Sequence, residues 1–303
     1  MIPHCPHHRP RHRLLLCAAL ALGLSASLLA EPQKAREGGL ELSARYSHSG
    51  SSELSGPAPA GKVSMDSFQL ALRTGTPLSA GTRLLYGLDW TRHELAFADA
   101  NSLPATLKTL TLPLGVSQRL DERWRLLAMA SPQLAGADGS LSTAGFALPL
   151  TALAHYTASP TLTWSFGLRH NSRADISLLP LVGVSWTFAP DWNFELGWPE
   201  SGLSYKVTPR LTLRANATVQ GGAYLLDGDP RLDNARTGAL ARTWLDYREL
   251  RAGVAASYAL TPAFSLRVDL GRVLDQRFDY TQRALTVKGG HPAYLTLSVL
   301  GRF

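Results

Sequence analysis

The residues best spaced for catalysis lie in the stretch His170-Asn171-Ser172. An imidazole two residues from a hydroxyl can act as the base that takes its proton, provided that a third polar group orients the ring. Asp175 is the nearest carboxylate, and residues 177–188 contain no Asp, Glu, Asn or Gln. The sequence therefore favours an ordinary histidine at a loop edge and predicts no enzyme, with catalysis by these residues as an alternative.

Metal ligands are also poorly grouped. Asp227, Asp229 and Asp233 form an acidic cluster, but they lack the ligand spacing of a calcium loop. The five histidines beyond residue 30 lie on separate segments, so their spacing assembles no metal site. We expect neither a metal nor a cofactor.

Charge and cysteine content change when the first 30 residues are set aside. Those residues hold both cysteines, Cys5 and Cys17, with three arginines and no acid. The rest has 27 Lys and Arg against 23 Asp and Glu and no thiol, which excludes a disulfide framework and a thiol nucleophile. The net charge falls from +7 to +4 and is spread thinly, so nucleic acid is not an expected partner.

The first 30 residues have the three-part layout of a secretory signal peptide. Residues 1–13 are basic, residues 14–29 are apolar, and Ala30 offers a small side chain for cleavage. The apolar run is short for a membrane-spanning helix. We expect a signal peptide over 1–30 and one domain over 31–303.

Apolar and polar residues alternate along most of the remaining chain. Residues 161–169, for example, place Leu162, Trp164, Phe166 and Leu168 on one face and mostly small or polar residues on the other. A period of two predicts strands with one apolar and one polar face. The same pattern recurs in residues 39–48, 83–91, 191–198, 211–220, 249–258 and 264–270.

The connections between these strands roughly alternate between two sizes. Short turns lie near residues 76–79, 120–123, 158–160, 189–191, 208–210 and 261–263. Longer polar stretches lie near residues 49–61, 98–105, 135–145, 171–175, 199–202, 227–242 and 275–292. Thirteen connections predict about fourteen strands, with 12 to 16 as the range. Such alternation is typical of a transmembrane, antiparallel, up-and-down β-barrel.

A two-sheet soluble sandwich would alternate too, but aromatic side chains argue against it. They gather on the apolar face near strand ends, as rings at a membrane interface do. The set comprises Trp90, Trp124, Trp186, Trp192, Trp198, Tyr205, Tyr258 and Phe264. We therefore expect an all-β barrel in a bacterial outer membrane, in contact with its lipids.

Two segments resemble known outer-membrane barrels. The last ten residues, 294–303, alternate back from Phe303 and resemble the terminal strand that the barrel assembly machinery recognises, although Gly301 replaces the usual large residue. Residues 178–186, 191–199 and 203–205 resemble a family of bacterial outer-membrane barrels of unknown function. The resemblance implies the fold and the assembly partner, and no activity.

If the apolar face contacts lipid, the polar face lines the lumen. Its charged candidates are Glu41, Arg45, Arg73, Arg83, Asp89, Arg125, Arg169, Glu195, Lys206, Arg214, Glu249, Arg251, Arg267 and Asp269. These groups can neutralise one another across neighbouring strands. Because nine are basic and five acidic, they can also favour anionic solutes in a water-filled passage.

Three functions follow from this arrangement. The first is a passive or weakly selective pore for small hydrophilic solutes, with anionic solutes as one option. The second is a closed structural or surface-binding barrel that acts through residues 49–61, 227–242 and 275–292. The third is an outer-membrane lipid hydrolase, because enzymes of that kind place His and Ser two residues apart, as at His170 and Ser172. The sequence leaves the solute, the state of the lumen and the oligomeric state open.

Overall fold

The computed structural model describes residues 39–56, 61–97, 103–139, 141–228, 230 and 240–303. The signal peptide expected over residues 1–30 lies outside them, as do Asp229 and Asp233 of the acidic cluster. None of the helices formed by the described residues is long and apolar enough to cross a membrane.

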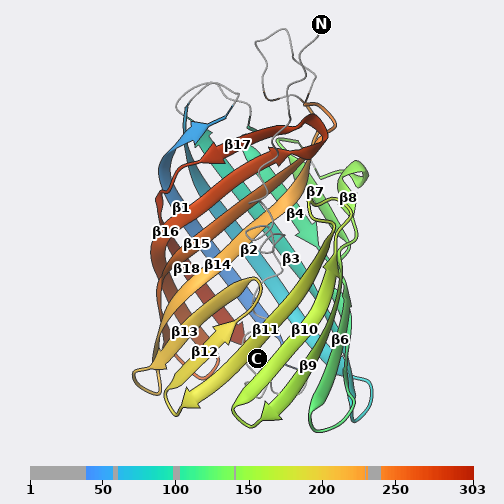
Figure 1. The fold of residues 1–303 in the computed structure, drawn as a ribbon, viewed down its shortest axis with the longest axis vertical. Helices are drawn as coiled ribbons and strands as arrows, with labels where there is room; N and C mark the ends of the chain where they lie inside the picture. The colour runs from blue at the N-terminus through green and yellow to red at the C-terminus, as the bar shows by residue number, and fades with distance from the viewer. Residues whose placement is uncertain (1–38, 57–60, 98–102, 140, 229, 231–239) are drawn as a thin grey trace, which may run out of the picture.

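The described strands form one closed antiparallel barrel (Figure 1). They are β1 (Glu41–Ser55), β2 (Lys62–Pro77), β3 (Thr82–Phe97), β4 (Thr106–Thr111), β5 (Leu114–Arg119), β6 (Trp124–Ala130), β7 (Gln133–Ala137), β8 (Phe146–Ala147), β9 (Leu150–Ser159), β10 (Leu162–His170), β11 (Leu178–Ala189), β12 (Trp192–Leu196), β13 (Glu200–Lys206), β14 (Leu211–Leu226), β15 (Trp244–Ala259), β16 (Phe264–Tyr280), β17 (Leu285–Gly289) and β18 (Ala293–Arg302). The wall closes where β1 pairs with β18, from Glu41 opposite Arg302 to Ser49 opposite Tyr294.

Prolines divide four of the wall strands into two segments each. Pro113, Pro132, Pro149 and Pro292 separate β4 from β5, β6 from β7, β8 from β9 and β17 from β18. A proline has no N–H to donate, but its carbonyl still accepts. Gly87 N, for example, donates to Pro113 O at 3.0 Å. Counting each divided strand once gives fourteen wall strands, which confirms the predicted number.

The two faces of the wall are those that the alternation predicts. On β10, Trp164, Phe166 and Leu168 are exposed on the outside, whereas Arg169 is buried on the inside. The short turns join neighbouring strands at one end of the barrel, called here the short-turn end, and the longer connections lie at the other, the loop end. In barrels of this class the short turns are periplasmic.

Interfacial aromatic pairs lie near the short-turn end. Trp124 packs on Tyr156 at 4.8 Å between ring centroids, and Trp192 on Tyr205 at 4.6 Å. Trp198 was expected among these outward rings, and that prediction is wrong. Because β12 ends at Leu196, the chain turns before Trp198, which packs against a buried apolar cluster instead.

Two of the expected long loops are largely strand. β1 continues to Ser55, β16 continues to Tyr280, and β17 occupies Leu285–Gly289. Much of the third stretch, 227–242, lies outside the described residues. The loop predictions failed because these strands run past the apolar belt, where polar residues face outward and the apolar residues, such as Phe278 and Val287, face inward.

The extended strands form a narrower ring at the loop end, which we call the loop-end ring. Here β14 has left β13 and pairs in parallel with β7, Leu225 opposite Gly136 and Leu226 opposite Ala137. The ring closes through the pairings of β1, β2, β3, β4, β7, β14, β15, β16 and β17. Nine strand segments therefore form the closed ring at this level, whereas fourteen strands form the wall below it.

The loop-end ring is filled by its own side chains, as small barrels are. Its apolar cluster includes Leu107, Tyr224, Tyr247 and Phe278, each at most 2% exposed. Contacts cross the interior: the His93 ring on β3 lies 5.4 Å from Tyr247 on β15. Among the described residues, this cluster closes the axis of the barrel at the loop end.

We predict that Phe166→Arg will destabilise the barrel. Phe166 is 44% exposed at the centre of β10, on the outer face. An arginine facing lipid near the midplane costs about 2 to 4 kcal/mol. Urea titration of protein refolded in lipid vesicles measures the loss, with Phe166→Leu as the apolar control. Equal stability of Phe166→Arg and parent would contradict the assignment of the outer face.

Candidate functional site: the charged lumen and a side opening

The structure places the fourteen charged candidates on inward positions of the wall. They alternate with the exposed apolar positions of the same strands. Most are buried or half-buried, and only Arg125 and Lys206 are exposed. The structure gathers nine of them into pairs and networks with other polar groups, and the other five make no ion pair with the acids that the structure describes.

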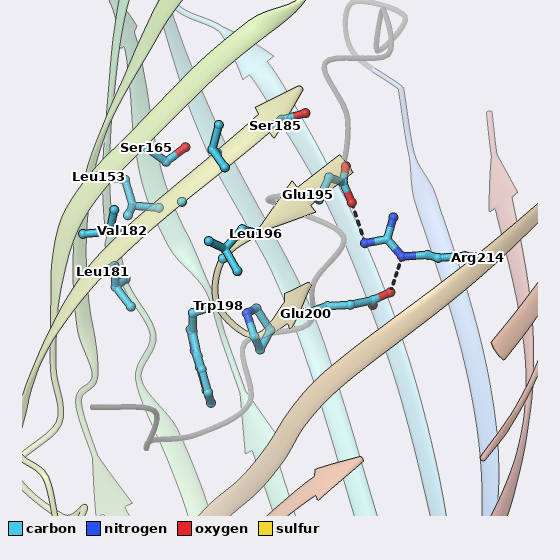
Figure 2. Close-up of a pocket in the computed structure, with 14 residues that line it drawn as sticks. Leu153, Ser165, Leu181, Val182, Ser185, Glu195, Leu196, Trp198, Glu200 and Arg214 are labelled. Atoms are coloured by element: carbon cyan, nitrogen blue, oxygen red, sulfur yellow. Dashed lines mark ion pairs between the residues drawn. The ribbon is translucent and has the colours of Figure 1, made fainter. Parts of the chain in front are cut away.

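One network centres on Arg214 of β14 (Figure 2). Its guanidinium lies between Glu195 of β12 and Glu200 of β13, with Nε 2.9 Å from Glu200 and an ion pair to Glu195. All three side chains are at most 12% exposed. Two carboxylates thus hold one cation where the β12–β13 hairpin meets the lumen.

The same network continues to β16 through Glu200. Arg267 donates to Glu200 at 3.1 Å and to Asp269 at 2.9 Å. Asp269 also accepts from Asn216 at 2.7 Å and from the Tyr294 hydroxyl at 2.8 Å. The charges are therefore compensated across strands that lie far apart in the sequence.

A second network lies beneath the loop-end ring. Arg251 pairs with Glu249, which also accepts from Tyr247. Arg251 donates to Ser47 at 2.6 Å and to Ser49 at 3.0 Å, which links β15 with β1 across the lumen. Glu249 is fully buried, so these bonds supply the partners that a charge removed from water requires.

Two further candidate pairs are local. Arg73 of β2 donates to Asp89 of β3 at 2.9 Å, and Arg302 pairs with Glu41 at 3.2 Å where the barrel closes. Each pair joins neighbouring strands. They fit the expectation that inward charges neutralise one another between adjacent strands.

Four basic side chains on inward positions at the short-turn end make no ion pair with a described acid: Arg83, Arg119, Arg125 and Lys206. Arg119 faces Arg125 directly in the register of β5 and β6, and Arg83 lies on the neighbouring β3. We call these four residues the basic mouth; Arg45 lies deeper, where it lines one pocket with Glu200 and Asp269. Like charges placed opposite one another destabilise a sheet, so this concentration is not explained by strand pairing.

The sequence did not reveal several members of the site. Arg119 shares the inward parity of Gly115 and Ser117 but was passed over beside the expected turn. Glu200 was expected in a loop, although it opens β13. Asn216 and Tyr294 are uncharged, and only the fold shows that both donate to Asp269.

The alternative catalytic residues are not brought together. His170 is exposed at the end of β10, and no hydrogen bond joins any two of His170, Ser172 and Asp175. The backbone N–H of Asp175 instead donates to Asp246 on β15 at 2.9 Å. Within the described part of the chain, no group of three His, Asp or Glu residues is arranged to hold a metal ion.

The wall has a gap between β11 and β14. Pairing of β11 with β12 ends at Val184 opposite Leu196, and pairing of β13 with β14 ends at Glu200 opposite Thr218. The β12–β13 hairpin therefore stops well below the end of β14 (Figure 1). We call this gap the side opening.

A pocket passes through the side opening. Its lining includes outward side chains, among them Val182 and Leu196, and inward ones, among them Leu181, Glu195 and Arg214 (Figure 2). It encloses about 630 Å³, including the part open to the outside. Because both faces contribute, the pocket connects the outer surface of the wall with the charged lumen.

Solved structures with a similar fold are outer-membrane proteins. The COG4313 outer membrane channel from Pseudomonas putida F1 is 15% identical over 90% of this chain and 99% of its own, with a TM-score of 0.51. A Pseudomonas aeruginosa FadL homologue is 12% identical over 88% and 90%, with a TM-score of 0.48. The translocator domain of the autotransporter NalP from Neisseria meningitidis is 14% identical over 88% of each chain, with a TM-score of 0.41. The likeness to the first shows a shared fold.

The closed wall and the apolar outer face agree with that likeness, and the protein is an outer-membrane β-barrel. No curated protein sequence matches the chain. The family described as Domain of unknown function (DUF6268) matches residues 88–288, which include the segments that resemble an outer-membrane family. This chain therefore belongs to the DUF6268 family.

Proposed function

We propose that this protein is a selective outer-membrane channel for small solutes and that it favours anionic ones. The observation that carries the proposal is the basic mouth. Its four cations face the lumen without ion pairs to described acids, whereas most of the deeper charges, Arg169 excepted, are compensated. A barrel of about fourteen strands is wide enough to hold water between its walls.

The basic mouth supports a preference for anions by its electrostatic field. Walls of low dielectric constant focus the field of charges that line a passage, which raises the local concentration of the opposite charge. Rings of Arg and Lys select anions in this way in anion pores. Arg83, Arg119 and Arg125 lie on consecutive wall strands, so their fields add.

The filled loop-end ring supports a selective channel over an open diffusion pore. Tyr247 and Phe278, which are paired on the neighbouring strands β15 and β16, are fully buried within this ring, and their side-chain rings stack at 5.0 Å. A solute that crosses along the axis must displace this cluster. The same closure favours a second candidate, a closed barrel that acts through its loop end, and conductance separates the two.

Two further points are part of the proposal. Residues 1–30 are removed as a signal peptide on export, and the strand that ends at Phe303 is recognised by the barrel assembly machinery. In the structure, the Phe303 ring packs edge-on against Phe264 at 5.4 Å and is 54% exposed.

We predict rare, small current steps from the parent protein in planar bilayers, and larger, more frequent steps from the double variant Tyr247→Ala, Phe278→Ala. The substitutions remove two rings from the cluster that blocks the axis. Phe68→Ala, on the outer face of β2, is the control for loss of an aromatic side chain. If the double variant conducts and the parent protein does not, the result favours the closed barrel. If neither protein conducts, the result contradicts the channel.

We predict that Arg83→Gln, Arg119→Gln and Arg125→Gln together will shift the reversal potential in a KCl gradient towards cation preference. The substitutions remove three unpaired lumen charges and keep the side chains polar. The protein used for this measurement also carries Tyr247→Ala and Phe278→Ala, so that its currents are large enough to measure. Arg92→Gln is the control because Arg92 lies on the outward parity of β3 and pairs with Glu94. An unchanged reversal potential would show that the basic mouth does not set selectivity.

A further inference from the structure

We propose that the side opening is a binding site for a small amphipathic anion, which enters from the membrane and places its anionic group at Arg169. The ligand has an apolar body and one carboxylate or similar head. As a route into the lumen this inference rests on the proposed channel function. As a binding site it stands on the geometry of the side opening alone.

The edges of the side opening are strand edges without a partner. Residues 178–182 of β11 pair with β10 on one side and with no described strand on the other. Pro180 lies in this stretch. Since proline within a sheet is confined to positions whose missing N–H would face away from a partner, its presence fits a permanently free edge.

The opening lies at the level of the apolar belt. Leu178, Val182 and Leu196 flank it and are each more than half exposed on the outer face. Below it, Gly197 has only the Gly183 Cα, 3.6 Å from where its Cβ would be, as a neighbour. An apolar molecule in the membrane therefore meets the opening directly, and no side chain at Gly197 obstructs it.

The loop between β10 and β11, which precedes the free edge of β11, is held in place by contacts with β15. The Arg173 guanidinium lies 5.1 Å from the centre of the Trp244 ring, and Asp175 N donates to Asp246 Oδ2 at 2.9 Å. Both contacts attach the loop to β15. The opening thus has an ordered frame, as expected of a site that recognises a particular molecule.

Arg169 is the unexplained charge inside this frame. It is 4% exposed, and its Nε and Nη1 atoms have no hydrogen-bond partner among the described residues. In the register it lies between Thr151 and Leu179, two residues along the strands from Leu153 and Leu181, which line the pocket. Two residues of strand span about 7 Å, so the cation lies within reach of a ligand in the pocket.

The other unsatisfied groups nearby are donors as well. The Trp198 Nε1 and Asn171 Nδ2 atoms are buried without an acceptor. Trp198 packs on the same apolar cluster as Leu179 and Leu181. A buried donor without a partner costs free energy, and a buried charge costs more. Donors of this kind favour a ligand that supplies acceptors and a negative charge over a cation.

Among the described residues in and around the pocket, Arg169 is the one buried charge that has no ion pair. Arg214, at the inner end of the pocket, is already held by Glu195 and Glu200. These two carboxylates repel a second anion. The ligand therefore keeps its head at Arg169 and its apolar body against Leu181, Val182 and Trp198.

Binding is tested on purified full-length protein in nanodiscs by the quenching of its tryptophan fluorescence. The charged probe is 11-bromoundecanoate, and the uncharged probe is 11-bromoundecanol. The quenching specific to the site is the part lost in Trp198→Phe. We expect Arg169→Gln to weaken the carboxylate about 10-fold to 100-fold, the range for a hydrogen bond to a charge, and to leave the alcohol unchanged. Arg92→Gln, on the outer face of β3, is the control for loss of an arginine.

A second variant tests the opening itself. Gly197→Phe fills the space beside Gly183 and is expected to abolish site-specific quenching by both probes, whereas Gly228→Phe, with nothing within 4 Å of its Cβ position, leaves it unchanged. Equal losses of acid and alcohol in Arg169→Gln, or quenching that survives Gly197→Phe, would overturn the inference. Binding without bilayer current would contradict the channel alone, and current without binding would contradict only this site.

Discussion

The requirement that every backbone N–H and C=O in hydrocarbon has a partner governs this structure. No water is available in the bilayer core, and each unpaired group costs several kcal/mol. Pairing of β1 with β18 therefore closes the sheet, and the strands divided by Pro113, Pro132 and Pro149 still accept hydrogen bonds through the proline carbonyls. The features that distinguish this barrel arise where β14 changes its partner and where the edge of β11 at the side opening is an exception to this requirement.

That exchange occurs at β14. Its first half pairs with β13, and its end pairs with β7, a strand from the other side of the barrel. The exchange divides the interior: Tyr224 and Leu226 face the core of the loop-end ring, while Ala223 and Leu225 face the second apolar cluster. It narrows the loop end enough for side chains to fill it, and it leaves β11 without a neighbour at the side opening. Axial closure and lateral access thus have one structural origin.

A period of two in apolar residues was enough to predict the membrane-spanning strands and their faces, because lipid on one side imposes strict alternation, and the count of connections predicted the number of wall strands. It could not predict the pairing of β14 with β7, which depends on contacts between segments about 90 residues apart. The position of Trp198 and the role of Glu200 depend on the short β12–β13 hairpin, and no local signal marks its end. The networks at Asp269 and Glu249 include neutral partners such as Tyr294 and Ser47, which a search for charges passes over.

Disulfide formation between Ala137→Cys and Leu226→Cys is the most direct test of this account. The two positions are paired in the register and share one core, and the described residues contain no cysteine. Met65→Cys with Leu95→Cys, a pair of ordinary wall neighbours in the same core, is the reference. The account predicts that both pairs cross-link to a similar extent in isolated outer membranes. Cross-linking of the reference pair alone would show that β14 does not turn inward to β7, and would contradict both the loop-end ring and the side opening.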